Sequence, residues 1–207
     1  MSIVKLNNRG VRSATAFGSI TALGSLIFIK KLTASSSSTI SFVDGSSDVV
    51  LDNSYKEYLF TFNNIHPSVD QPAFQFNLSI DSGSNYNVTK TSTSFRAYQS
   101  EGGGSTAVQY EANHDLAQST SAERLCAADL GNDNDQSASG ELRLFDPSST
   151  TYVKHWVSTM QIYNSSDYSV IFRTAGYFNT TSAIDEIQFK PASGTIDAGV
   201  IKLYGVS

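Results

Sequence analysis

The sequence predicts an all-β protein: a β-sandwich of jelly-roll type with about ten strands, preceded by an extended N-terminal arm. Apolar and polar side chains alternate through most of the chain from residue 39 onward, which is the period of a half-buried strand. Turns rich in Gly, Asn, Asp and Ser separate these runs, and only one short stretch has the pattern of a helix. A chain of 207 residues is long enough for one sandwich domain, which we place at 39–207, with the arm at 1–38.

The predicted arm contains one apolar strand and a serine run. Residues 26–29 are Leu-Ile-Phe-Ile, which is apolar on both faces of a strand. Four serines follow at 35–38, a composition typical of a flexible hinge. Under the alternative interpretation, the whole segment is the first part of the sandwich and the serines form a surface loop.

Near the N-terminus, basic residues precede a moderately apolar stretch, which superficially resembles a secretory signal peptide. Lys5, Arg9 and Arg12 come before residues 14–29. Thr, Gly and Ser dilute that stretch, and two lysines follow it where a cleavage site would be. It is also too polar and too short to span a bilayer. We therefore expect neither secretion by this segment nor membrane insertion.

Alternation with a period of two predicts strands along the rest of the chain. The clearest strand covers residues 74–80, where Phe74, Phe76 and Leu78 alternate with polar residues. The other strands are predicted at 40–42, 58–62, 86–98, 108–110, 142–144, 153–162, 170–178, 187–189 and 200–204.

Residues 120–128 are predicted as a short helix, and an acidic loop follows at 129–136. The clustered oxygens of this loop could bind calcium, but the loop lacks the glycine and glutamate positions of an EF-hand. A solvated turn is therefore the favoured interpretation, and we expect no bound metal.

Two predicted strands have apolar side chains on both faces, which indicates burial on both sides. In residues 153–162, Trp156 and Met160 lie on the face opposite Val157. Together with Leu26 and Phe28 of the first strand, Trp156 and Met160 are candidates for a subunit interface in a homo-oligomer. Burial inside the sandwich would explain the same pattern.

The sequence contains no constellation of residues that predicts catalysis. The three histidines lie in separate segments, and only His114 has an adjacent acid, Asp115. The nucleophile elbow, the zinc-protease motif and paired cysteines are all missing from the sequence. The single cysteine, Cys126, cannot form an intrachain disulfide. We expect a protein that is not an enzyme and that uses no cofactor.

Charged residues make up 16% of the chain and the net charge is −5. Binding to nucleic acid relies on clustered Lys and Arg that neutralise phosphates. The 14 basic residues form no such cluster, so nucleic acid is not an expected partner.

Sugar binding is the functional alternative that the composition suggests. Proteins bind a sugar ring by stacking it on an exposed aromatic side chain, while Asn, Asp and Gln bond its hydroxyls. Tyr98, Tyr110 and Tyr177 lie near predicted loops with such side chains close by, so they are candidate glycan contacts. The alternative is that they are ordinary strand tyrosines with one apolar face.

Three stretches of the chain resemble structural proteins of tailed bacteriophages, particularly phages of marine bacteria. They are MSIVKLNNRGV at the start, YLFTFNNIHPSVDQPAFQFNLSIDSGSNYN in the first half, and IDEIQFKPASGTIDAGVIKLYGV at the end.

The resemblance implies an accessory virion protein that decorates the capsid or forms a tail appendage. Its partners would be other virion proteins, it would be a homo-oligomer such as a trimer, and it would assemble into the virion in the host cytoplasm. Capsid decoration is slightly favoured over a tail role, because the sequence has no fibrous repeat or heptad. The alternative function is a carbohydrate-binding adhesin or receptor-binding module of a tail fibre, with a host-surface glycan as its ligand.

Overall fold

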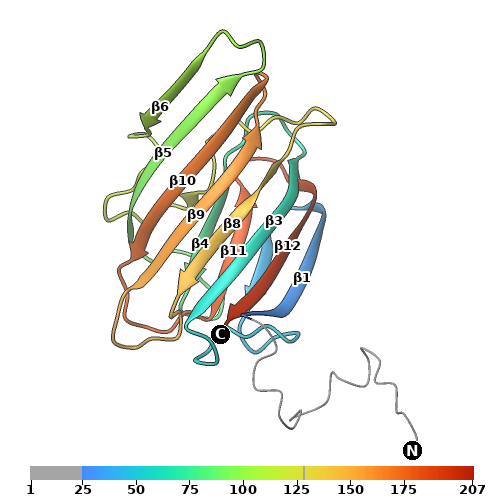
Figure 1. The fold of residues 1–207 in the computed structure, drawn as a ribbon. Coiled ribbons are helices and arrows are strands. Elements are labelled where there is room, and N and C mark those ends of the chain that lie inside the picture. Colours follow the sequence, from blue (N-terminus) through green and yellow to red (C-terminus); the bar gives the residue numbers. More distant parts are fainter. Residues whose placement is uncertain (1–24, 128) are drawn as a thin grey trace, which may run out of the picture.

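The computed structural model describes residues 25–127 and 129–207, and these residues form two antiparallel sheets that face each other (Figure 1). The eight-stranded sheet has the order β1 (Leu26–Ser37), β12 (Ile196–Val206), β3 (Glu57–Pro67), β8 (Ala138–Phe145), β9 (Lys154–Tyr163), β10 (Tyr168–Phe178), β5 (Lys90–Ser100) and β6 (Thr106–Tyr110). The four-stranded sheet has the order β2 (Ile40–Val43), β11 (Glu186–Pro191), β4 (Phe74–Ser79) and β7 (Glu123–Arg124). The predicted all-β sandwich is confirmed, with twelve strands and no helix in the described part of the chain.

Aromatic side chains fill the space between the sheets. The ring of Phe189 on β11 lies 5.2 Å from that of Phe62 and 5.4 Å from that of Phe60, both on β3. It also contacts three further rings, those of Phe42, Phe74 and Phe76. These side chains come from alternate positions of their strands, so the period-2 pattern of the sequence translates directly into this core.

Residues 111–127 and 129–137, named here the crossing segment, close the side of the sandwich between β5 and β4. The segment first follows β5, where Lys90 N–H donates to Ser119 C=O at 2.8 Å. It then joins the smaller sheet as β7, which pairs with β4. The predicted helix at 120–128 is wrong, because Glu123 pairs with Phe76 and Leu125 N–H donates to Phe74 C=O at 2.8 Å. Pairing with β4 thus overrides the local helix preference.

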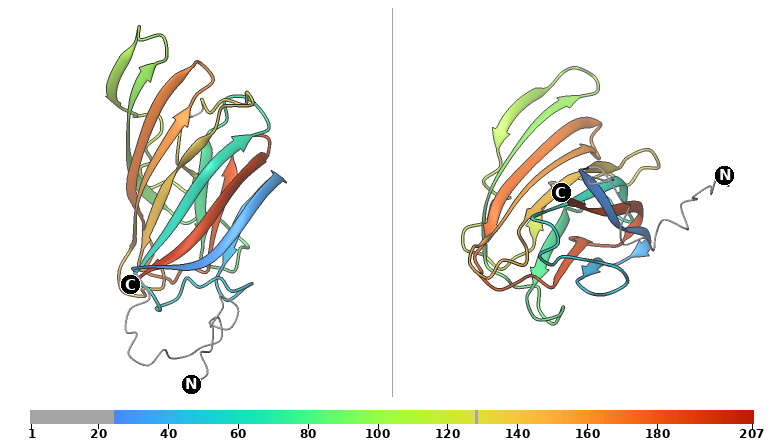
Figure 2. Two further views of the ribbon diagram at one scale, coloured as in Figure 1. Left: turned by 45° about the vertical axis from the view of Figure 1, so that its right-hand side comes forward. Right: turned by 60° about the horizontal axis from the view of Figure 1, so that its bottom comes forward.

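Both ends of the described chain lie at one end of the sandwich (Figures 1 and 2). Leu26 of β1 pairs with Val206 of β12, and Ser207 N–H donates to Ser25 C=O at 3.2 Å. The β5–β6 and β9–β10 turns lie at the opposite end, which we call the distal end. The start of the described chain therefore lies at the end of the sandwich away from these two turns.

The first strand changes the boundary of the predicted arm. Leu26–Ser37 pairs along its whole length with β12, so this part of the 1–38 segment belongs to the larger sheet, as the alternative interpretation had it. The predicted serine hinge lies largely in this strand. Residues 1–24 of the predicted arm lie outside the described residues.

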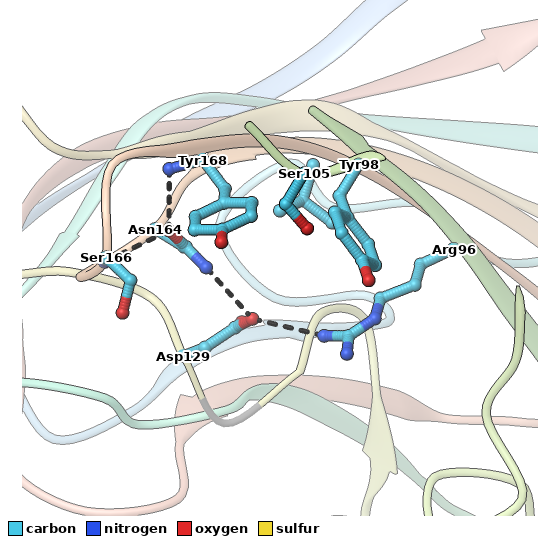
Figure 3. A pocket seen from close by; sticks show the side chains of 8 residues that line it. Arg96, Tyr98, Ser105, Asp129, Asn164, Ser166 and Tyr168 are labelled. Atoms are coloured by element: carbon cyan, nitrogen blue, oxygen red, sulfur yellow. Dashed lines mark hydrogen bonds and ion pairs between the residues drawn. The ribbon is translucent and has the colours of Figure 1, made fainter. Parts of the chain in front are cut away.

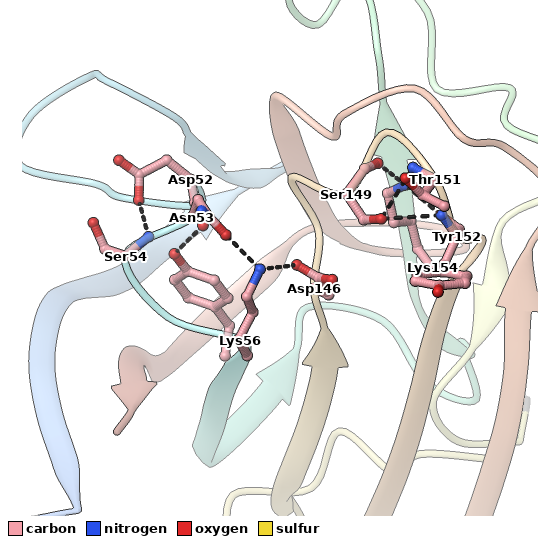
Figure 4. A network of polar contacts seen from close by, with 10 residues as sticks. Asp52, Asn53, Ser54, Lys56, Asp146, Ser149, Thr151, Tyr152 and Lys154 are labelled. Atoms are coloured by element: carbon pink, nitrogen blue, oxygen red, sulfur yellow. Dashed lines mark hydrogen bonds and ion pairs between the residues drawn. The ribbon is translucent and has the colours of Figure 1, made fainter.

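Near the termini, a buried lysine organises the turn between β8 and β9 (Figure 4). Lys154 is fully buried, and its ammonium donates to the C=O groups of Ser149 at 2.6 Å and Tyr152 at 2.9 Å. Burial lowers the pKa of Lys154. Beside this turn, Lys56 binds Asp146 at 3.2 Å. We interpret this cluster as structural, because the lysine donors are taken up by groups of the protein.

Candidate functional site

A polar cavity of about 370 Å³ opens at the distal end, between the β5–β6 and β9–β10 hairpins (Figure 3). It lies on the inner face of β5 and β10, where the turn of the crossing segment at Asp129 approaches the sheet. Its lining consists of Arg96, Tyr98, Ser105, Asp129, Asn164, Ser166, Tyr168 and Val170. We refer to it as the distal pocket.

Two tyrosines form the aromatic part of the distal pocket. The rings of Tyr98 on β5 and Tyr168 on β10 meet edge to face with centroids 5.6 Å apart. Alternation along the antiparallel pair places both on the inner face of the sheet, where Val170 is the partner of Tyr98. The Arg96 guanidinium lies 5.4 Å from the Tyr98 ring centroid, within the range of a cation–π contact. The two rings are thus held in place while their hydroxyls face the cavity (Figure 3).

Arg96 joins two carboxylates that come from separate parts of the crossing segment. Its Nε lies 2.7 Å from Glu111 Oε1 and its Nη1 lies 3.3 Å from Asp129 Oδ2. Glu111 Oε2 also lies 3.1 Å from His114 Nδ1. Burial lowers the pKa of His114, with a further contribution from the nearby Arg124. Arg96 therefore ties the crossing segment to β5 as well as lining the cavity.

Asp129 has one oxygen that the protein leaves unused. Its Oδ2 accepts from Arg96 and from Asn164 Nδ2 at 3.4 Å, whereas its Oδ1 is buried without a hydrogen-bond partner among the described residues. Burial raises the pKa of Asp129, and the bond from Asn164 acts against this rise. Oδ1 is therefore a buried acceptor at the wall of the cavity whose hydrogen-bonding capacity the described residues leave unsatisfied.

Asn164 fixes the turn that carries Tyr168. Its side-chain oxygen accepts the N–H groups of Ser166 at 3.1 Å and Tyr168 at 2.9 Å. An Asx-type turn of this kind pre-orders the backbone, so the Tyr168 side of the distal pocket is built before any ligand arrives.

The side chains of the distal pocket are suited to binding a small polar molecule. Two aromatic rings, a carboxylate, an amide, a guanidinium and two serine hydroxyls converge there. Among the described residues that line the cavity there is no histidine or cysteine. Within residues 25–127 and 129–207, no group of three or more His, Cys, Asp or Glu side chains is placed to hold a metal ion.

Of the three tyrosines predicted to contact a glycan, the structure places only Tyr98 in the distal pocket. Tyr110 and Tyr177 lie on the outer face of the same sheet. Tyr110 is paired with Phe95, and its hydroxyl donates to Asp115 at 2.6 Å. Tyr177 lies beside His155, with 6.4 Å between the ring centroids. Through its partner Phe95, Tyr110 lies level with Arg173 of β10, which is four residues, or about 13 Å, from Tyr177. The three tyrosines therefore do not form one site.

The predicted interface residues divide into two groups. Leu26 and Phe28 are half exposed, at 49% and 51%, on the outermost strand β1, where Phe28 meets Tyr204 edge to face. Trp156 and Met160 are fully buried. Trp156 packs against Phe76 of the smaller sheet at 5.6 Å. The apolar pattern of this face is therefore explained by the core of a single chain, and Trp156 and Met160 are not available to a neighbouring subunit.

Sequence reasoning missed most of the distal pocket. No sequence pattern predicts a site role for Arg96, Asn164 or Tyr168, and the favoured interpretation of the loop that contains Asp129 is a solvated turn. One signal was present for Arg96, since it shares its strand face with Tyr98 two residues later. Asp129 contacts both Arg96 and Asn164, and each of these residues is more than thirty residues away from it in the sequence. Such contacts leave no local pattern in the sequence.

Comparisons with protein-family models, with curated proteins and with solved structures gave no match. In the described part of the chain, no helix is long and apolar enough to cross a membrane.

Proposed function

We propose that this chain is a non-catalytic accessory protein on the surface of a tailed-phage virion, with capsid decoration favoured over a tail appendage. The observation that carries the proposal is that the two ends of the sandwich differ. The described chain begins at one end, where β1 starts, and the distal pocket with its two hairpins lies at the other (Figure 1). A domain with two different ends can be attached through one end while it presents the other to the surroundings.

The strand order supports the jelly-roll type within this proposal. Eight strands give the orders β1-β12-β3-β8 and β2-β11-β4-β7, in which each strand holds the same place in its sheet as its neighbour in sequence holds in the other. The hairpins β5–β6 and β9–β10 then extend the larger sheet beyond this core. Jelly rolls of this kind occur in viral capsid proteins and in lectins. The proposal thus rests on the architecture together with the sequence resemblance to phage structural proteins.

Deletion of residues 2–24 tests the attachment role. The deletion leaves every described strand intact, whereas removal of all 38 residues of the predicted arm would also remove β1 and expose the β12 edge. We expect the shortened chain to keep its far-UV spectrum and thermal midpoint but to be missing from purified particles. Particles that incorporate the shortened chain at the normal level would contradict attachment through this segment.

Carbohydrate recognition is the second candidate function, and the distal pocket favours it. A sugar ring presents apolar C–H faces and many hydroxyls, which match the rings of Tyr98 and Tyr168 and the polar side chains that line the cavity. The site is preformed by Asn164, which reduces the ordering cost of binding.

A glycan array probed with the full chain tests this second function, with Tyr98→Ala and Tyr177→Ala as matched variants. The distal pocket predicts that Tyr98→Ala abolishes retention of any bound glycan and that Tyr177→Ala leaves it unchanged. Loss of binding in Tyr177→Ala but not in Tyr98→Ala would move the site to the outer face, and no binding by the unaltered chain would remove the proposed carbohydrate function.

A further inference from the structure

We propose that β6 is a pairing edge through which two copies of this chain join their larger sheets into one continuous sheet around a two-fold axis at Val108. The proposal goes beyond the proposed virion role and does not depend on it. It rests on three features of β6: backbone groups that have no partner among the described residues, exposed apolar side chains and a self-complementary register.

The four sheet edges differ in their protection against pairing. At one edge of the larger sheet, β1 carries Lys30 and Lys31 and has a register irregularity between Phe28 and Lys30. The edges of the smaller sheet are only four and two residues long in β2 and β7. Lysines, bulges and short strands are the usual devices that prevent edge pairing. β6 reads Thr-Ala-Val-Gln-Tyr and has no charge, proline or bulge in its pairing with β5.

The register shows which backbone groups of β6 are free for a partner. Ser100 N–H donates to Ser105 C=O at 2.8 Å, and Glu111 N–H donates to Ser94 C=O at 2.9 Å. In an antiparallel ladder hydrogen-bonded positions alternate, so residues 107 and 109 also face β5. The N–H and C=O groups of Thr106, Val108 and Tyr110 consequently point outward, away from the sheet.

The side chains next to this edge are unusually exposed for apolar residues. Val108 is 77% exposed, Tyr110 56% and Phe95 46%. Val108, Ala97 of β5 and Ile171 of β10 lie in one row across the outer face of the sheet. An apolar row that reaches an unprotected edge is a surface that a further strand would extend and partly cover.

A second copy of β6 fits this edge. Antiparallel pairing around Val108 places Val108 opposite its own copy and Thr106 opposite Tyr110 of the other chain. All three residues present their backbone groups at the spacing that such a ladder needs. The apolar row then continues from Ile171 and Ala97 through the two Val108 side chains into the other subunit. This contact is isologous and closed, so it yields a dimer and no further growth.

Sedimentation of the full chain over about 1 to 100 µM tests the proposal, because an interface of this small size is expected to be weak. We expect the unaltered chain to reach the mass of a dimer. Val108→Pro removes only an outward N–H and so spares the ladder to β5. Val108→Lys adds an edge charge. We expect both variants to raise the dissociation constant at least about tenfold.

Val157→Lys serves as the control, since Val157 is exposed on the same outer face but lies on β9, away from the edge. This variant should dimerise like the unaltered chain. A monomer or a trimer of the unaltered chain throughout this range would overturn the proposal, and so would a dimer that persists in both Val108 variants.

Discussion

The two halves of the sandwich interior differ in chemistry. Between β11 and β3, phenylalanine rings around Phe189 exclude polar groups from the core. Under β5 and β10, the crossing segment instead buries charged side chains, among them Lys90 and Glu123. Burial of apolar surface stabilises a fold, whereas each buried charge costs free energy unless it is compensated. The first half therefore holds the fold together, whereas the second is retained at a cost in stability, next to the distal pocket.

Phe189→Ala should have the largest effect, because it removes the ring that the other phenylalanines of the core share. We expect a loss of about 3–5 kcal/mol in the free energy of unfolding, as for other large core truncations. Urea denaturation measures it, with Phe95→Ala on the exposed outer face as the matched control. Similar losses for the two variants would contradict the aromatic half as the main source of stability.

Arg96→Met should have an intermediate effect in the charged half. The change keeps much of the side-chain volume but leaves Glu111 and Asp129 without their shared cation. Because Arg96 is partly exposed, we expect about 1–3 kcal/mol, less than for a fully buried ion pair. The same denaturation experiment tests it. An unchanged midpoint would mean that the ion pairs do not hold the crossing segment in place.

The smallest effect concerns the pH dependence of stability, which the charged half alone should produce between pH 5 and 7. Burial raises the pKa of Glu123 from 4.5 to about 7, and the Ser92 hydroxyl and Lys90 act against this rise. The folded chain therefore keeps a proton that the unfolded chain loses above pH 4.5. Stability from this group is present at low pH and is lost as the pH rises through 7, by about 1–2 kcal/mol between pH 5 and 7.

Glu123→Gln should flatten that slope. His114 is present in both chains and cancels in the difference. Burial also lowers the pKa of Lys90 to about 8, which affects stability mainly above the measured range. Free energies of unfolding at pH 5, 6 and 7 provide the measurement. An identical slope in the two chains would show that Glu123 is not responsible.

The aromatic half could be predicted from the sequence, and the charged half could not. Strict alternation over residues 74–80 predicts β4 and its buried face, because the position of each phenylalanine in the pattern indicates which face of the strand is buried. The segment at 121–127 has helix-compatible residues, and its strand form depends on pairing with Phe74 and Phe76. For Trp156, an apolar face alone does not distinguish a core from a subunit interface. In the distal pocket, Tyr98 could be predicted because it is an aromatic residue near a loop. Its neighbours Asp129, Asn164 and Tyr168 are far away in the sequence, and only the folded structure brings them close to it.

The most direct test of the proposed virion role is electron microscopy of gold-labelled particles from a phage that encodes this chain, with an epitope inserted after Gly103. This glycine lies in the exposed turn between β5 and β6, at the distal end. The proposal predicts gold on the surface of intact particles, over the capsid if the protein is a decoration protein and at the tail if it is an appendage. Intact particles that lack the chain would contradict the virion role, and particles that contain the chain but bind no gold would contradict the outward orientation of the distal end.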